Sequence, residues 1–71
     1  MKQYLVLYEK GENNWSAYAP DVPGCVAAAA TREETETLFQ EALEFHFEGM
    51  REDGKPIPEP ATWAGMVTIA A

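Results

Sequence analysis

The side chains with the most reactive chemistry in this chain are one cysteine, Cys25, and one histidine, His46. A thiol and an imidazole can form a nucleophile–base pair when the fold brings them together. The sequence gives such a pair little support, because Cys25 has no adjacent cation to favour its thiolate and His46 lies on the apolar side of a predicted helix. One Cys and one His also lack the ligand number and spacing of the usual metal sites. We therefore expect Cys25 to be a small buried side chain, and we expect no metal and no cofactor.

The elements that would position these side chains follow the order strand, strand, strand, helix, strand. Residues 3–10, 15–19 and 25–30 have strand-like composition and are separated by the turn-forming stretches GENN and DVPG. A last strand is predicted over residues 63–70, after a proline-rich connector. A right-handed crossover through the helix would place it beside the first strand and parallel to it, which makes the first strand central.

The predicted fold class is therefore α+β, with two layers in β-β-β-α-β order. Residues 1–71 form a single domain in which one helix packs on a four-stranded sheet. The other face of the sheet has no cover within the chain.

The predicted helix begins at a capping box, in which Thr31 accepts from the Glu34 amide and the Glu34 carboxylate reaches back to the Thr31 amide. It runs to about Glu52, where Asp53 and Gly54 fit a helix end and Pro56, Pro58 and Pro60 follow.

The helix has one apolar stripe and one acidic side. The stripe contains Thr35, Leu38, Phe39, Ala42, His46, Gly49 and Met50. Phe47 falls outside it, so Phe47 is either a half-exposed aromatic residue or an oligomer contact, and we favour the contact. Glu41, Glu44 and Glu48 lie on the opposite side and are called the acidic ridge below. The ridge is either a solvated face or a surface for a basic partner.

Paired carboxylates were the remaining route to catalysis, because β-β-β-α-β is also how the ribonuclease H fold begins. Nucleases of that fold hold Mg²⁺ with carboxylates from the first strand, the helix and the fourth strand. Here the first strand offers only Glu9, and residues 63–71 contain no acidic residue. The chain also lacks a glycine-rich phosphate loop and a nucleophile-elbow motif. We expect the protein not to be an enzyme.

Charge and composition exclude further classes of function. The chain has 71 residues, 12 of them acidic and five basic, and a formal net charge of −7 without a basic cluster. Direct nucleic-acid binding and binding to an anionic membrane are therefore not expected. No signal peptide or membrane-spanning stretch is recognisable, so the expected location is the cytoplasm. Because the core must be small, we expect partner chains to supply additional burial.

Two segments flank the predicted helix. Residues 18–25, YAPDVPGC, precede its Thr-x-x-Glu start, and residues 52–60, EDGKPIPEP, follow it. Together, and at this spacing, they resemble the HicB-like antitoxins. The resemblance covers nearly the whole chain and implies a partial, non-catalytic ribonuclease H-like fold. It also implies binding and inhibition of HicA, a small basic toxin that cleaves mRNA. Many HicB proteins carry a C-terminal DNA-binding domain; this sequence stops at Ala71, so operator binding is not carried over.

The resemblance fixes no toxin-contacting residues, and we interpret both matched segments as turns and a helix stop. We expect the acidic ridge, Glu41, Glu44 and Glu48, to contact the HicA-like toxin. Phe47, Met66, Val67 and Ile69 are the expected contacts of a homodimer or higher oligomer. The alternative function is a self-associating HicB-like domain with a structural or regulatory role unrelated to a toxin.

Overall fold

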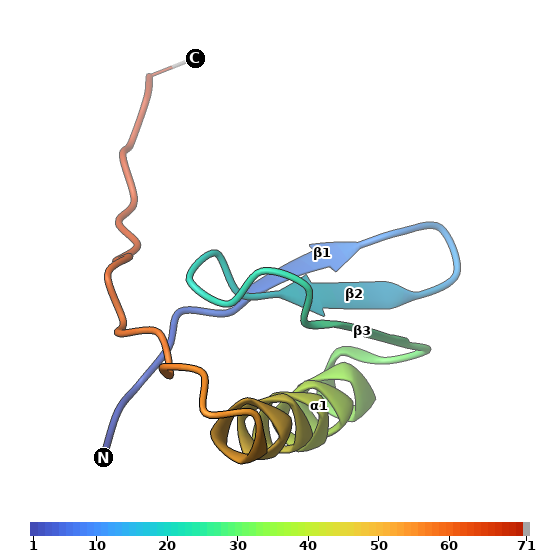
Figure 1. Cartoon of the computed structure of the whole chain (residues 1–71). Helices are drawn as coiled ribbons and strands as arrows, with labels where there is room; N and C mark the ends of the chain where they lie inside the picture. The colour runs from blue at the N-terminus through green and yellow to red at the C-terminus, as the bar shows by residue number, and fades with distance from the viewer. Residues whose placement is uncertain (71) are drawn as a thin grey trace.

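The computed structural model describes residues 1–70, which form three strands followed by one helix (Figure 1). The elements are β1 (Leu7–Lys10), β2 (Trp15–Tyr18), β3 (Val26–Ala29) and α1 (Arg32–Glu52). The strands form one antiparallel sheet in the order β1-β2-β3, and α1 packs on one face, mainly against β3 and β2. This confirms the predicted α+β class and the packing of one helix on a sheet.

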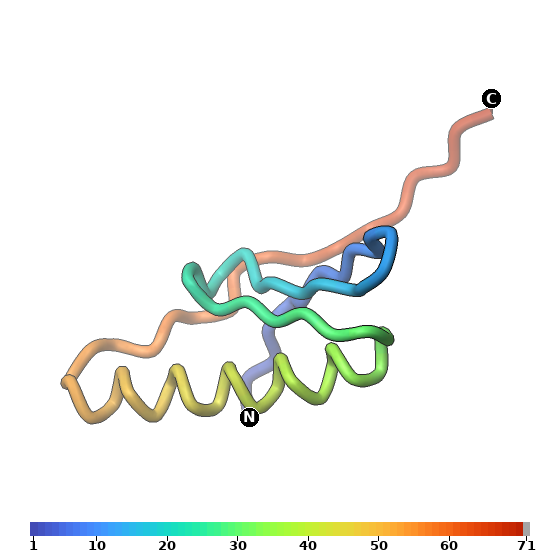
Figure 2. The backbone as a smooth tube through the Cα atoms, turned by 90° about the vertical axis from the view of Figure 1, so that its right-hand side faces the viewer, coloured from blue at the N-terminus to red at the C-terminus, as the bar shows by residue number. Residues whose placement is uncertain are grey.

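The predicted four-stranded sheet is wrong for this structure, because residues 63–70 form no strand. In Figure 1 they run away from the body of the molecule, and in Figure 2 their C-terminal end projects beyond it. β1 therefore pairs only with β2, and β2 rather than β1 is the central strand. A ribonuclease H-like topology would need the missing strand beside β1, and that feature of the predicted fold is not observed.

β1 also begins later than predicted, at Leu7 instead of residue 3. Its partner β2 ends at Tyr18, paired with Leu7, and the chain then turns at Ala19 and Pro20. Proline has no amide hydrogen to continue the ladder. Residues 3–6 consequently have no strand beside them on that side.

Both predicted turns are present and connect the strands. The Gly11 amide donates to the Asn14 carbonyl oxygen at 2.8 Å and closes the hairpin between β1 and β2. Pro23 and Gly24 then form the turn before β3, with Gly24 at φ +88°. A positive φ after proline is typical of a type II turn, in which glycine avoids the steric cost of a Cβ atom.

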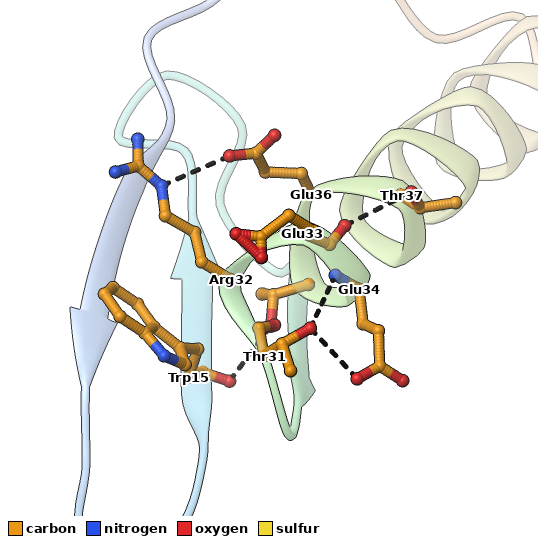
Figure 3. Close-up of polar contacts among 8 residues, drawn as sticks. Trp15, Thr31, Arg32, Glu33, Glu34, Glu36 and Thr37 are labelled. Atoms are coloured by element: carbon orange, nitrogen blue, oxygen red, sulfur yellow. Dashed lines mark hydrogen bonds and ion pairs between the residues drawn. The ribbon is translucent and has the colours of Figure 1, made fainter.

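The start of α1 is held by Thr31 and Glu34, as predicted (Figure 3). The Thr31 hydroxyl oxygen accepts from the Glu34 amide at 3.1 Å. The Glu34 carboxylate, however, accepts from the Thr31 hydroxyl at 2.9 Å, so the predicted contact with the Thr31 amide is wrong. An i,i+4 ion pair between Arg32 and Glu36, at 3.2 Å, adds to this first turn.

The end of α1 is a Schellman motif built on Gly54. Gly54 has φ +69°, and its amide donates to the Arg51 carbonyl oxygen at 3.1 Å. The Lys55 amide donates to the Met50 carbonyl oxygen at 2.8 Å, which completes the motif. The predicted stop at Asp53 and Gly54 is confirmed.

The core lies between α1 and the inner face of the sheet. Its buried residues are Ala17, Ala19, Val22, Cys25, Phe39 and Phe47, together with Thr35. Tyr8, Ala17 and Ala27 stand opposite one another across the three strands and share this face. The small alanine side chains let the helix lie close to the sheet.

The buried stripe of α1 is rotated relative to the predicted one. Phe47 is only 9% exposed, whereas Leu38 is 45% exposed, so the predictions for both residues are wrong. The Tyr4 ring lies 5.2 Å from the Phe47 ring, and Ile57 also packs against the core. Tyr4, which precedes the sheet in the sequence, and Ile57, which follows the helix, thus cover the side of α1 that carries Phe47. Helical periodicity alone predicts this side to be exposed. The predicted oligomer contact at Phe47 depends on exposure that the structure does not show.

Candidate interaction surfaces

The acidic ridge is an exposed line of carboxylates on α1. Glu41, Glu44 and Glu48 are spaced by three and four residues, so they share one side of the helix, roughly opposite the core. Within residues 1–70 none of the three forms an ion pair, and Arg51 lies beside Glu44 and Glu48 without pairing. Like charges at i,i+4 destabilise a helix slightly, and no ion pair within residues 1–70 offsets this cost.

An apolar strip that the sequence analysis did not identify lies beside the acidic ridge. Phe45 is 75% exposed on α1, with Leu38 two turns earlier on the same flank. A groove of about 440 Å³ runs between β3 and α1, and Phe45, Gly49 and Val26 at the start of β3 are among the residues that line it. The helix sequence contains a signal for this strip. If Phe39 and Phe47 face the core, Leu38 and Phe45 form a second apolar stripe on another side of the helix.

The structure places Cys25 and His46 along this same groove. Cys25 is buried, as predicted, and its burial raises the pKa of the thiol. A raised thiol pKa opposes formation of the thiolate that a nucleophile needs. Within the described residues no hydrogen bond joins Cys25 to His46, whose ring instead lies 6.2 Å from the Phe47 ring. The pair therefore does not have the arrangement of a catalytic dyad.

The outer face of the sheet carries an apolar row that nothing in residues 1–70 fully covers. Leu7, Tyr18 and Val26 stand opposite one another across β1, β2 and β3, and the latter two are exposed. Glu9 of β1 is exposed on the same face, on the opposite side of the sheet from α1 and its acidic side chains. This arrangement agrees with the prediction of a sheet covered on one face only.

Asp21 fastens the chain that follows the proline-rich connector, and we call this contact the Asp21 latch. Its carboxylate accepts from the Ala61 amide at 2.8 Å and from the Thr62 hydroxyl at 2.6 Å. These hydrogen bonds lower the pKa of the Asp21 carboxyl group, and the bond from the Ala61 amide has the larger effect. Asp21 belongs to the DVPG turn, so this turn does more than reverse the chain.

Two further contacts tie the connector to the N-terminal segment. The Tyr4 hydroxyl donates to the Pro58 carbonyl oxygen at 2.6 Å, and Lys2 pairs with Glu59 at 2.8 Å. The connector is thus held from both sides up to residue 62. Beyond that point the chain is exposed.

The Asp21 latch predicts a pH-dependent release of residues 61 and 62. Because the folded-state pKa of Asp21 is lowered, its stabilising contribution is present above the unfolded-state pKa and is lost as the pH falls through the folded-state value. We expect the Ala61 amide to lose protection from hydrogen exchange as the pH is lowered from neutral through the acidic range, after correction for intrinsic exchange rates.

The matched control is Asp21→Asn, which keeps an acceptor oxygen but cannot ionise. This variant should show weaker Ala61 protection at neutral pH and little further change in acid. An identical acid transition in Asp21→Asn would contradict the assignment of the transition to Asp21.

The C-terminal residues predicted as oligomer contacts are all exposed. Met66, Val67 and Ile69 are 98%, 83% and 74% exposed, and Trp63 is exposed as well. The structure does not bring them together with the acidic ridge, which lies on α1. The sequence-predicted sites therefore form two separate surfaces.

Residues 1–70 contain neither a helix that could cross a membrane nor a cluster of side chains that could bind a metal ion. Within residues 1–70, no helix combines the length and apolar character needed to cross a bilayer. In the same part of the chain, no three His, Cys, Asp or Glu side chains are grouped so that they could hold a metal ion.

Comparison with known proteins gives a consistent match. Residues 4–69 match the family described as "HicB_like antitoxin of bacterial toxin-antitoxin system". An uncharacterized 14.9 kDa protein in the rep-hol intergenic region of Haemophilus phage HP1 is 39% identical over 56 residues, which are 79% of this chain and 42% of the phage protein. Antitoxin HicB 2 of Photorhabdus laumondii is 37% identical over 60 residues, 84% of this chain and 43% of that protein. The chain thus spans less than half the length of these relatives, and no solved structure is significantly similar to it.

Proposed function

The chain belongs to the HicB-like antitoxin family of bacterial toxin–antitoxin systems, and from this premise we propose that it binds and neutralises a small, basic, mRNA-cleaving toxin of the HicA type. The acidic ridge is the observation that carries the proposal for the binding surface. Its three carboxylates are exposed and unpaired within residues 1–70, in a chain of net charge −7. A basic RNA-binding surface is the complementary partner, because opposite potentials steer association and fix orientation.

The apolar strip beside the ridge supplies the other part of such an interface. Binding energy is concentrated in a few buried aromatic or aliphatic residues, while charges at the rim act on association rate and specificity. Phe45 and Leu38 are exposed next to the acidic ridge and fit the role of anchors. Together the two features provide an apolar contact flanked by negative charge.

The proposed mechanism is occlusion without chemistry by the antitoxin itself. Carboxylates on the ridge occupy cationic side chains that would otherwise contact RNA phosphates. The toxin then loses access to its substrate for as long as the complex lasts. This role needs no metal, no cofactor and no direct contact of the antitoxin with nucleic acid, and it places the protein in the cytoplasm with its target.

Co-expression with a HicA-type toxin tests the proposal. We expect the toxin to arrest growth when expressed alone, and this chain to restore growth and co-purify with the toxin. The control is the toxin expressed together with the Phe39→Ala variant. Because this variant should be much less stable, it should rescue growth less well if rescue requires the folded antitoxin. Failure of both rescue and co-purification with a HicA-type toxin encoded next to the gene for this protein would contradict the pairing.

A second candidate function rests on the exposed C-terminal residues. Met66, Val67 and Ile69 favour self-association, which could serve a structural or regulatory role unrelated to a toxin. A chain that forms homo-oligomers but binds no toxin would support this candidate over the first. Self-association and toxin binding can also coexist, because the surfaces involved are separate.

A further inference from the structure

Residues 63–70 form an extended, apolar segment that we call the C-terminal arm. The arm contains no charged residue, although charged residues make up 24% of the chain. Trp63, Met66, Val67 and Ile69 all expose their side chains. Short neutral segments with β-branched residues pair readily with other strands and cause aggregation when left uncovered. The arm therefore has the composition of a strand but no strand beside it.

The molecule exposes more surface than expected for one folded chain of its mass. Its accessible surface is 5692 Å², whereas a compact monomer of 7.9 kDa exposes about 4,400 Å². Its radius of gyration is 14.1 Å, against roughly 11 Å for a compact chain of this length. The surplus surface is roughly 1,300 Å², and a standard interface covers about 800 Å² on each partner. The surplus surface is therefore large enough to provide one partner's side of a stable interface.

β1 offers a place for an additional strand. It pairs with β2 on one side only, so its other edge is unpaired within residues 1–70. An open groove of about 690 Å³ lies next to the start of β1 and is lined by residues 2–6, Tyr8 and the α1 side chains Phe39 and Leu43. A strand on the β1 edge that continued along residues 2–6 would satisfy free backbone groups and place alternate side chains over the groove.

The arm of the same chain leaves this groove instead of filling it. The Asp21 latch fixes Ala61 and Thr62, and Trp63 and Ala64 line the end of the groove. Beyond them the arm runs away from the sheet in Figure 1, and in Figure 2 its end projects past the sheet. Eight extended residues reach about 26 Å, far enough to lie on a neighbouring molecule.

We propose that the C-terminal arm of one copy adds as a strand to the free β1 edge of a second copy, and that the exchange is reciprocal. Mutual exchange of an identical element gives a closed, two-fold symmetric dimer. The neutral arm also lets two chains of net charge −7 meet away from their acidic ridges. This inference specifies the self-association proposed above and does not depend on toxin binding.

Charged substitutions on one side of the arm test the exchange. Val67 and Ile69 share one side of an extended strand, and Thr68 points to the other. We expect the full chain to sediment as a dimer at micromolar concentration, and Val67→Lys and Ile69→Lys to sediment as monomers. Thr68→Lys, which adds the same charge, should remain dimeric. Circular dichroism should show the α1 signal in every variant, because the arm is outside the core.

Nuclear magnetic resonance on mixed samples identifies the surface that receives the arm. In a dimer of one isotope-labelled and one unlabelled chain, we expect contacts between chains from the Val67 and Ile69 methyl groups to residues 2–8. A monomeric full chain would overturn both self-association and exchange. A dimer that persists in Val67→Lys and Ile69→Lys, or arm contacts found only within one chain, would overturn the exchange while leaving toxin binding to its own test.

Discussion

Replacing Phe39 by alanine is expected to lower the free energy of unfolding by about 3–5 kcal/mol, which is the usual cost of removing a buried phenylalanine side chain. Phe39 is among the largest fully buried side chains, and it faces the alanine-rich sheet from the middle of α1. A chain of this length has a total stability of only about 4–11 kcal/mol. The substitution should therefore remove a large part of the stability, and urea denaturation followed by circular dichroism measures it.

Leu38→Ala is the matched control for this prediction. Leu38 is the preceding residue and is 45% exposed, so its truncation should cost less than about 1 kcal/mol in the isolated chain. Equal losses of unfolding free energy at the two positions would contradict the observed difference in burial between Phe39 and Leu38. In the toxin complex, by contrast, Leu38→Ala should weaken binding, because Leu38 belongs to the proposed apolar anchor.

Reversing the charge of Glu44 and Glu48 to lysine is expected to weaken toxin binding by about 100-fold or more. Placing like charges opposite each other across an interface costs several kcal/mol, and each 1.4 kcal/mol is tenfold in affinity. The fold should be retained, because both residues are exposed and form no ion pair within residues 1–70. Titration calorimetry gives the affinity, and growth rescue gives the consequence in cells; adding Glu41→Lys should extend both effects.

Glu9→Lys combined with Glu12→Lys provides the control. This pair makes the same change in net charge but lies on β1 and the following turn, away from α1. If binding depends on the acidic ridge, the control should lose only the modest long-range attraction and should keep rescue. Equal loss in both double variants would show that net charge, rather than the ridge, governs association, and would contradict the proposed surface.

The local parts of the fold could be predicted from the sequence because they depend on neighbouring residues. Thr31 and Glu34 mark the start of α1, and Gly54 marks its end, through contacts made within one helical turn. The DVPG turn is equally local, because proline and glycine fix its backbone angles. These signals do not depend on what packs against the helix or the sheet.

The parts that could not be predicted depend on segments distant in the sequence. Burial of Phe47 depends on Tyr4 and Ile57, which no helical periodicity includes. The composition of residues 63–70 is that of a strand, but composition does not determine which edge a strand joins. The Asp21 latch joins positions 40 residues apart through side-chain and backbone atoms, and the turn motif alone gave no sign of it.

The alanine-rich inner face of the sheet has a consequence for the entropy of folding. Alanine has no side-chain rotamers to lose on burial, whereas larger side chains lose about 0.5–2 kcal/mol each in rotational freedom. Ala17 and Ala19 are buried in the core and the partly buried Ala27 packs against it, so ordering this surface costs little beyond the backbone. A small core can then hold the strands and α1 together even though the apolar residues of the arm contribute nothing to it. The rotational freedom lost in the core therefore belongs mainly to Phe39, Phe47 and Val22, while Met66, Val67 and Ile69 of the arm stay exposed and lose none.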